Sequence, residues 1–220
     1  MRECAQTRES ELSQQALDAL VTELKNRKFS GNHLEIGTAA GGTLKTILGM
    51  YSDLHQKIGQ FFVVDPMTYF PDQYQIVVEN IKSNPKIQLE KVEFIQMKSD
   101  EAFRSIQGKA ISQLDFILID GAHKIKYVAQ DVRWVDRLNQ GGLLCFDDYH
   151  AGFDGVDYVV DKIVLESGLF KQVFYVDRLL CLEKVESGRK AISTHQLIVS
   201  HLLHPIFQLI ASLRKRFKHV

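Results

Sequence analysis

The chain has 220 residues, 45% hydrophobic and 25% charged, and its 27 basic and 27 acidic side chains balance to zero net charge. This profile is typical of one large globular domain with a sizeable core. Neutrality argues against nucleic acid, or any acidic partner that covers a whole face of the protein. Cys4, Cys145 and Cys181 show no metal-ligand spacing, and two of them lie in apolar runs. We therefore expect reduced core thiols and a cytoplasmic protein.

Targeting signals and membrane spans are not evident in the sequence. Residues 1–14 are polar, with no apolar segment after their charges, so we expect no secretory signal. No uninterrupted apolar run is long enough to cross a bilayer.

Short apolar runs alternate with amphipathic segments along the chain, which is typical of an α/β fold with a mostly parallel sheet. The amphipathic segments predict helices at residues 11–29, 72–84, 126–139 and 155–168. The apolar runs predict seven strands, covered by helices on both faces, at residues 33–37, 61–65, 92–97, 114–120, 142–148, 171–176 and 179–185.

Only Asp177 and Arg178 separate the last two predicted strands. A parallel pair needs a longer crossover, so these strands must form an antiparallel hairpin. The prediction is a Rossmann-like, seven-stranded, mostly parallel sheet with a closing antiparallel hairpin. We expect a helical segment at 1–30, the main domain at 31–186 and a basic amphipathic helical extension at 187–220.

The first predicted strand runs into a glycine turn, LEIGTAAGGT, which opens a helix. Glycines at 37, 41 and 42 allow the backbone to approach a ligand and present N–H groups to it. The G-x-x-x-G spacing and the carboxylate of Glu35 argue against the phosphates of a dinucleotide. A carboxylate there suits an ammonium group or hydroxyls. The alternative is a plain strand-to-helix turn.

Two later strand ends add to this signal. Asp65 ends the second strand, 28 residues after Gly37, where an acid can accept both hydroxyls of a ribose. Ser99 or Asp100 follows the third strand and could contact an adenine edge. The alternative for this Ser-Asp pair is a helix N-cap.

Together, the glycine turn, the strand ending VVDP and the closing hairpin resemble class I S-adenosylmethionine-dependent methyltransferases, over roughly residues 30–185. The resemblance implies that S-adenosylmethionine is the cofactor and that Asp65 holds its ribose. It also implies that the other cofactor contacts come from Glu35, Gly37, Thr38, Gly41, Ser99, Asp100 and Asp120.

The fourth and fifth strands end in FILIDGAHK and LLCFDDYH. In an open parallel sheet these ends lie at one rim, which brings Asp120, Asp147 and Asp148 together. Converging carboxylates raise one another's pKa unless a cation lies among them. Oxygen ligands of this kind suit Mg²⁺, with Ca²⁺ and Mn²⁺ as alternatives, and argue against zinc.

His123, three residues after Asp120, is the predicted general base, because an imidazole titrates near neutral pH. The pattern D-G-x-H followed by D-D resembles metal-assisted sugar and small-molecule O-methyltransferases of the macrocin type. By that resemblance Asp120, Asp147 and Asp148 are metal ligands and His123 is the base. Each residue alone also has an ordinary explanation, as a helix cap, a solvated loop residue or a turn histidine.

Four nearby residues are alternatives for parts of this site. Lys124, Lys126 and His150 are weaker candidates for the base, and Tyr149 either lines the acceptor pocket or packs. The predicted reaction is methyl transfer from S-adenosylmethionine to a hydroxyl of a small molecule such as a sugar or natural product.

Other functions remain open. The chain could be a non-catalytic binding module of the same fold, or a methyltransferase for another acceptor. The glycine spacing, Glu35 and the hairpin disfavour a nicotinamide dehydrogenase. Neutral charge and the absence of an N-P-P-Y-like motif weigh against adenine N-methylation, so no nucleic-acid partner is expected.

Apolar residues recur at helical spacing beyond residue 192, and Pro205 should kink or divide that helix. Such a basic amphipathic helix lies on an anionic membrane, or it packs on the domain or on a second subunit of a homo-oligomer. We expect three of its histidines to be surface residues: His195, His201 and His204. The segment ends in a basic cluster of Arg214, Lys215, Arg216 and Lys218.

Overall fold

The computed structural model describes residues 8–217, with side chains as far as residue 214. Cys4 and Lys218 therefore lie outside the described residues, and so do the side chains of Lys215 and Arg216.

A single seven-stranded sheet forms the centre of the molecule, in the order β3-β2-β1-β4-β5-β7-β6. Strands β1 to β5 pair in parallel, and β7 runs antiparallel to both of its neighbours, β5 and β6. This arrangement confirms the predicted sheet and its closing hairpin. The strands are β1 (Asn32–Ile36), β2 (Phe61–Val64), β3 (Val92–Ile95), β4 (Leu114–Ile119), β5 (Leu138–Phe146), β6 (Phe170–Val176) and β7 (Leu179–Lys184).

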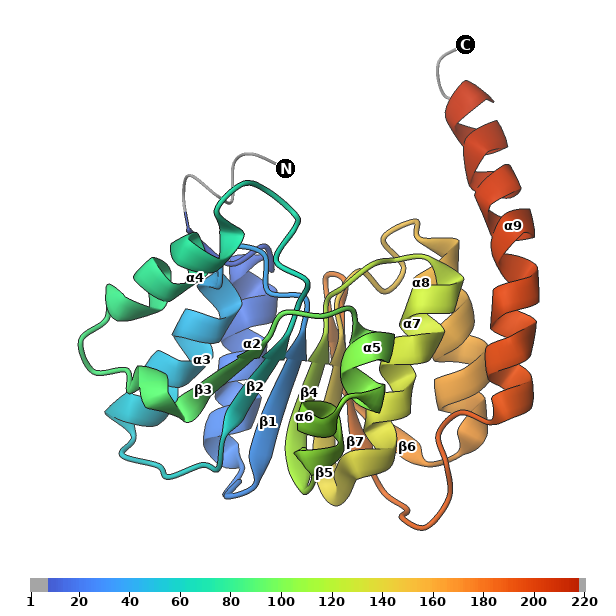
Figure 1. Ribbon diagram of the computed structural model, residues 1–220. Coiled ribbons are helices and arrows are strands. Elements are labelled where there is room, and N and C mark those ends of the chain that lie inside the picture. Colours follow the sequence, from blue (N-terminus) through green and yellow to red (C-terminus); the bar gives the residue numbers. More distant parts are fainter. Residues whose placement is uncertain (1–7, 218–220) are drawn as a thin grey trace.

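Helices cover both faces of the sheet (Figure 1). Alternate residues of each central strand enter different cores, as Val63 and Val64 of β2 do. Strands buried on both faces read as continuous apolar runs, which is why the sequence indicated them clearly. One face carries α2 (Gln14–Asn26), α3 (Gly42–Asp53) and α4 (Gln73–Lys82), and the other carries α5 (Ser99–Arg104), α6 (Ile106–Ala110), α7 (Ile125–Asp131) and α8 (Asp154–Val159).

The four predicted helices are shorter than the sequence indicated, and two of them continue as other kinds of turn. The segment at 126–139 is α7 followed by a 3₁₀ turn, Val132–Arg137, and β5 already begins at Leu138. Leu138 pairs with Leu114 of β4, although polar residues and two glycines follow it. The segment at 155–168 is α8 followed by a π-helical turn, Val160–Val164, and a short 3₁₀ turn. Tertiary pairing therefore outweighs local pattern at these boundaries.

The strand ends that carry the predicted site meet at one edge of the sheet. The N–H of Gly37 donates to Val64 O at 3.0 Å, and the N–H of Asp120 donates to Ile36 O at 2.9 Å. Asp147 continues the row, with its N–H 3.1 Å from the carbonyl oxygen of Ile119. Residues that follow three neighbouring strands, β1, β4 and β5, are thus held side by side by the backbone ladder itself.

Helix α9 (Thr194–Phe217) stands outside α7 and α8 and extends beyond them (Figure 1). It is continuous through Pro205, so the proline does not divide it. By length and composition alone, the 21 residues Thr194–Arg214 could cross a membrane. The sequence-based expectation concerned only uninterrupted apolar runs, whereas polar residues interrupt this segment and its mean hydropathy is still high.

Smaller sequence predictions are confirmed in part. Cys145 and Cys181 are free, buried thiols opposite each other on β5 and β7. His195 and His201 are exposed, as expected. His204 is half-buried against Tyr127, with ring centroids 6.3 Å apart, so it is not a simple surface residue.

Candidate active site

The glycine turn after β1 depends on backbone conformations that only glycine adopts readily. Gly37 has φ +83°, and a Cβ added there would overlap the carbonyl oxygen of Asp120. Gly41 also has a left-handed conformation, with φ +78°, and directly precedes α3. The turn therefore brings the backbone of β1 against the end of β4 with no space for a side chain.

Two buried acids hold this turn in place. Thr38 Oγ1 donates to Glu35 Oε2 at 3.0 Å, and the N–H of Thr38 donates to Asp65 Oδ2 at 3.0 Å. The N–H of Met67 donates to the other oxygen of Asp65 at 2.6 Å. Burial raises the pKa of Glu35 to about 8, against the opposing effect of the Thr38 hydrogen bond. Burial also raises the pKa of Asp65, although its hydrogen bonds oppose this.

The residues after β3 divide into one that reaches the cleft and one that does not. Ser99 lines the cleft and accepts a hydrogen bond from Trp134 Nε1 at 3.0 Å. Asp100 instead forms ion pairs with Arg133 and Arg104, each at 2.6 Å. The N-cap of α5 is Lys98, with no side-chain cap, so the expected Ser-Asp cap is not present.

An unpredicted acid lies beside Ser99. Asp131 of α7 is buried, lines the cleft and hydrogen-bonds with Ser99. Burial raises the pKa of Asp131 to about 7, despite that hydrogen bond. No spacing in the sequence connects residue 131 to residue 99, because the two meet only when α7 packs on α5.

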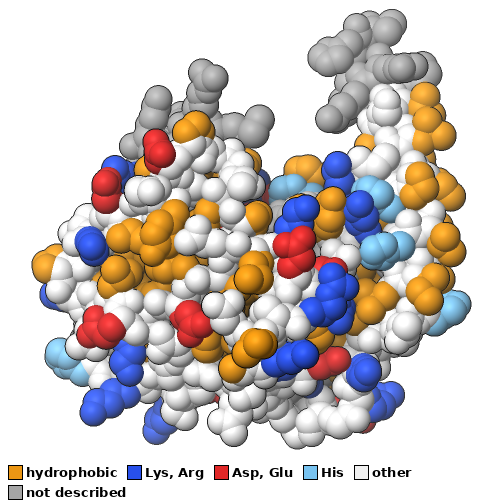
Figure 2. Space-filling model, in the orientation of Figure 1, with side chains coloured by type: hydrophobic (Ala, Val, Ile, Leu, Met, Phe, Trp, Pro, Cys, Tyr) orange, Lys and Arg blue, Asp and Glu red, His pale blue; other side chains and the backbone are white. Residues whose placement is uncertain are grey.

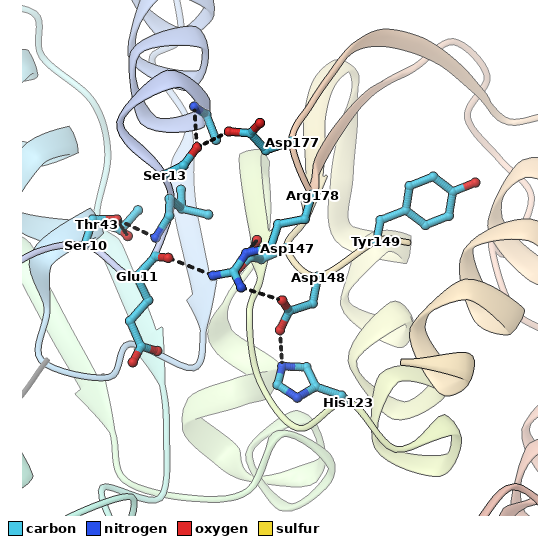
Figure 3. A network of polar contacts seen from close by, with 12 residues as sticks. Ser10, Glu11, Ser13, Thr43, His123, Asp147, Asp148, Tyr149, Asp177 and Arg178 are labelled. Carbon is cyan, nitrogen blue, oxygen red and sulfur yellow. Dashed lines mark hydrogen bonds and ion pairs between the residues drawn. The ribbon is translucent and has the colours of Figure 1, made fainter. Parts of the chain in front are cut away.

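The rim of β4 and β5 carries a connected network of charges (Figure 3). His123 Nε2 lies 2.7 Å from Asp148 Oδ2. Arg178, from the turn between β6 and β7, lies 3.3 Å from Asp147 Oδ1 through Nε and 3.1 Å from Asp148 Oδ1 through Nη1. The second carboxylate of the pair is thus shared between an imidazole and a guanidinium.

The adjacent aspartates differ in their electrostatics. Burial and the neighbouring Asp148 carboxylate raise the pKa of Asp147 to about 6. Burial also acts to raise the pKa of Asp148, but His123 and Arg178 outweigh it, and the net shift is downward. The pKa of Asp120 is raised well above its ordinary value by burial, and further by Asp147 and other nearby carboxylates.

Three of these groups could hold a metal ion. Ligand atoms of Asp120, His123 and Asp148 all lie within 4.8 Å of one another. Among the described residues, Oδ1 of Asp147 and Oδ1 of Asp148 are buried and accept no hydrogen bond. A carboxylate-rich cluster with such oxygens fits a hard divalent cation. The cluster contains His123 where the sequence predicted Asp147, which is directed at Arg178.

Arg178 was not predicted, although it bears on the metal argument. The sequence indicated that paired aspartates need a cation among them. The guanidinium supplies one positive charge to both carboxylates, so the need for a metal is weaker than the sequence alone suggests.

A cleft of about 1430 Å³ opens above these groups. It brings together most of the predicted site residues: Gly37, Asp65, Ser99, Asp120, His123, Asp147 and Asp148. Four predicted cofactor residues do not line it, namely Glu35, Thr38, Gly41 and Asp100. The first three of these support the turn from beneath.

The alternative candidates for the base differ in whether they line this cleft. Lys124 lines it, whereas Lys126 and His150 do not. Tyr149 points away from the aspartates (Figure 3), and its hydroxyl donates to Asp161 at 2.7 Å, so it packs and does not line the pocket. Phe153, unpredicted, lines the cleft and stacks on the His123 ring, with centroids 4.2 Å apart.

Two chain segments far from the motifs complete the walls. Ser10 Oγ and Thr43 Oγ1 are 2.6 Å apart, and Arg178 Nη2 donates to Glu11 O at 2.7 Å, so the segment before α2 is fixed across the cofactor turn (Figure 3). On the opposite side α9 contributes Phe207 and Arg214, among others. Local sequence gave no signal for either contribution.

Comparison with known proteins identifies the family. The profile of a family described as a methyltransferase domain matches residues 34–149, more than half of the chain. The chain belongs to this methyltransferase family. The expected resemblance to class I S-adenosylmethionine-dependent methyltransferases is confirmed, and the protein is an enzyme of that class. No curated protein matches the sequence of this methyltransferase.

Solved structures share the fold of this methyltransferase at low sequence identity. A candidate caffeoyl-CoA O-methyltransferase from Staphylococcus aureus has a TM-score of 0.64 and 17% identity, over 84% of this chain and 90% of that one. CalS11, a TDP-rhamnose 3'-O-methyltransferase of calicheamicin biosynthesis, has a TM-score of 0.60 and 12% identity, over 76% of each chain. An O-methyltransferase from Bacillus cereus in complex with SAH has a TM-score of 0.57 and 14% identity, over 79% of this chain and 83% of that one.

Proposed function

We propose that the protein transfers a methyl group from S-adenosylmethionine to a hydroxyl group of a small molecule bound in the cleft. The observation that carries the proposal is the His123–Asp148 pair, which lies at the strand ends next to the glycine turn and the Asp65 carboxylate. CalS11, which shares the fold, is described as a sugar O-methyltransferase, and this supports a hydroxyl acceptor.

The cofactor part of the proposal uses the β1 and β2 ends. Gly37 lines the cleft at the start of the turn, and Asp65 would accept hydroxyls of the ribose. Each oxygen of Asp65 accepts one backbone N–H, and Gln73 adds a side-chain hydrogen bond, so the carboxylate is held in place at the cleft wall. Glu35, Thr38 and Gly41 act from beneath by holding the turn.

The adenine end would lie towards β3 and α7. Ser99 and Asp131 both line the cleft there and are joined by a hydrogen bond. Asp100 is directed into its ion pairs and is left out of the proposed contacts.

The acid–base part of the proposal uses the β4 and β5 ends. His123 accepts the proton of the acceptor hydroxyl, and Asp148 orients the ring and stabilises the imidazolium that forms. The hydroxyl oxygen forms a bond to the methyl carbon as the sulfur–carbon bond breaks. When bound, S-adenosylmethionine supplies that methyl group and leaves as S-adenosylhomocysteine. Holding both reactants in line contributes much of the acceleration.

We further propose that a divalent ion, with Mg²⁺ as first choice, assists the transfer. Asp120 and Asp148 would hold it, with Asp147 as the third carboxylate if Arg178 releases it, or His123 as a nitrogen ligand. Such an ion would supply positive charge that acidifies an acceptor hydroxyl. If the imidazole binds the ion, it cannot also act as the free base, so metal binding and the base role compete for His123.

Transfer of labelled methyl from S-adenosylmethionine to a panel of sugar, vicinal-diol and phenol acceptors tests the proposal. His123→Ala should lower the rate roughly a hundredfold or more, while calorimetry shows unchanged S-adenosylmethionine binding. His150→Ala is the matched control, because that histidine does not line the cleft, and it should change the rate less than about threefold. Cofactor binding without turnover of any acceptor would favour the non-catalytic binding module instead.

The metal is tested separately. Treatment with EDTA and then readdition of Mg²⁺ should abolish and restore transfer if the ion takes part. The Asp120→Asn variant should then lose most activity and also fail to respond to Mg²⁺. Full activity in EDTA would show that no metal takes part in the reaction. The charged groups at the rim would then act without one: His123, Asp148 and Arg178.

A further inference from the structure

One face of α9 is apolar and uncovered by the rest of the described chain. Its large apolar side chains are between 42% and 68% exposed, and they recur every three or four residues, which places them in one stripe along the helix. Figure 2 shows hydrophobic side chains in a row along the outer edge of this helix. We call this the outer stripe; it consists of Ile198, Leu202, Ile206, Leu209 and Leu213.

The opposite face of α9 is fixed to the domain. Leu197, Leu203 and Phe207 pack against the core beneath α7 and α8, and Phe207 contacts Tyr158 with ring centroids 5.5 Å apart. Near its end, Arg214 makes two contacts of 2.7 Å with the carboxylate of Asp154. The helix is therefore anchored along one side, and the outer stripe faces away from the domain.

Charge divides the chain sharply at this helix. Residues 187–220 contain six Lys and Arg and no Asp or Glu, whereas residues 1–186 contain the other 21 Lys and Arg and all 27 Asp and Glu. The segment thus carries +6 and the rest of the chain −6, counting His as neutral. The basic residues stand just before the helix, at 189–190, and at its end, at 214–218, and two of them pair within the domain, Arg189 with Glu186 and Arg214 with Asp154.

We propose that the outer stripe docks on an anionic phospholipid bilayer, with α9 lying in the plane of the interface. An apolar face flanked by Lys and Arg is the pattern of helices that bind such surfaces. Because only one face of α9 is free, the helix enters the headgroup region sideways and does not span the bilayer.

Charge favours a membrane over a second copy of the chain. Two outer stripes packed together would bring basic ends into contact in either orientation, since both ends of the helix are basic. Like charges at an interface are unfavourable, while anionic lipid complements both ends at once.

Docking would also place the cleft beside the headgroups. The inner side of the same helix supplies Phe207, Gln208, Ala211 and Arg214 to the cleft wall. If the proposed methyl transfer is correct, this position favours an acceptor hydroxyl held at the membrane surface. That consequence rests on the proposed function, whereas the docking itself does not.

Vesicle flotation with the whole chain tests the docking without any activity measurement. The protein should float with phosphatidylcholine vesicles that contain phosphatidylglycerol, float much less with phosphatidylcholine alone, and be released by high salt. The double variant Leu202→Asp, Leu209→Asp should reduce partitioning roughly tenfold or more, because two apolar side chains no longer enter the interface. Ile106→Asp is the matched control, since Ile106 is 87% exposed on α6, and it should float like the parent protein.

Circular dichroism must show that the double variant is folded, and Lys215→Glu with Lys218→Glu gives a second variant that weakens binding through charge. Three results would overturn the proposal. The first is failure of the parent protein to float, and the second is a loss of vesicle binding with Ile106→Asp as large as that with the double variant. The third is retention on vesicles after alkaline carbonate, which would indicate a helix that spans the bilayer. A dimer in sedimentation that the double variant converts to monomer would assign the stripe to a second copy instead.

Discussion

The two halves of the site rim use acidic residues in opposite ways. At the β1–β2 ends, Glu35 and Asp65 are buried, and their oxygens accept hydrogen bonds from the turn that they support. At the β4–β5 ends, Asp147 and Asp148 each have a buried oxygen that accepts no hydrogen bond among the described residues. The first half is satisfied by hydrogen bonds and shapes a binding surface, while in the second half the same two oxygens face the guanidinium of Arg178, so their charge is balanced by an ion pair. Burial of an acid therefore says little about its task until its partners are known.

The largest expected effect comes from breaking the first half at Gly37. Gly37→Ala combines an unfavourable φ with overlap against the Asp120 carbonyl oxygen, so we expect a loss of about 3 kcal/mol or more in unfolding free energy and no detectable cofactor binding. Gly141→Ala has a similar φ of +80° but meets nothing within 4 Å, so it isolates the conformational cost, about 1 kcal/mol. Urea unfolding and calorimetry give both values, and equal losses in the two variants would refute the steric argument.

In the second half, Arg178→Gln removes the positive charge between the two aspartates. We expect a loss of about 2 kcal/mol in unfolding free energy at neutral pH, below the cost for a fully buried pair because the Arg178 side chain is 40% exposed. Lys86→Gln, which breaks an exposed pair with Asp53, should cost much less. If Mg²⁺ binds the rim, it should raise the melting temperature of Arg178→Gln more than that of the parent protein. Equal stability of the two variants would show that the aspartates need no counter-charge.

The satisfied half makes a prediction about pH. The pKa of Glu35 is about 8 in the folded protein against an ordinary 4.5, so between these values the folded state keeps a proton that the unfolded state loses. The contribution of Glu35 to stability is therefore complete below pH 4.5 and is lost as pH rises towards 8, by up to about 1.4 kcal/mol per pH unit. Glu35→Gln should abolish this slope. The difference in unfolding free energy between variant and parent, measured across this range, checks it, and a constant difference would contradict a neutral Glu35.

The smallest effect is expected at Asp100. Asp100→Asn should change S-adenosylmethionine affinity less than about twofold and cost about 1 kcal/mol in stability, because its carboxylate serves Arg133 and Arg104. Calorimetry beside thermal unfolding separates the two effects. A tenfold loss of affinity would return Asp100 to the cofactor contacts that the family resemblance implied.

The sequence predicted the structural features that depend on hydrophobic periodicity and on where strands end. It missed the contacts that depend on packing between segments distant in the sequence. Buried strands are continuous apolar runs, so the sheet, the hairpin and the convergence of Asp120 with Asp147 and Asp148 at one cleft followed directly. The position of Arg178 among these acids could not, because it depends on β7 pairing with β5.

The residues at the edges of the site also could not be predicted from local sequence patterns. Asp131 meets Ser99 only through the packing of α7, and Phe153 reaches His123 only through the loop before α8. Asp100 looked like a cofactor residue because Arg133 reaches it only in the folded chain, although its i+4 neighbour Arg104 was a local signal of an ion pair.

The turn at Asp177 and Arg178 has a consequence for the order in which the protein is made. Asp177 hydrogen-bonds Ser13 at the start of α2, and Arg178 contacts both Glu11 and the paired aspartates. Strand β6 pairs only with β7, the last strand of the sheet. A nascent chain that has not yet emerged past residue 184 therefore has an unpaired edge segment and two aspartates without their guanidinium. During synthesis, the reaction centre can be completed only after nearly the whole domain has left the ribosome.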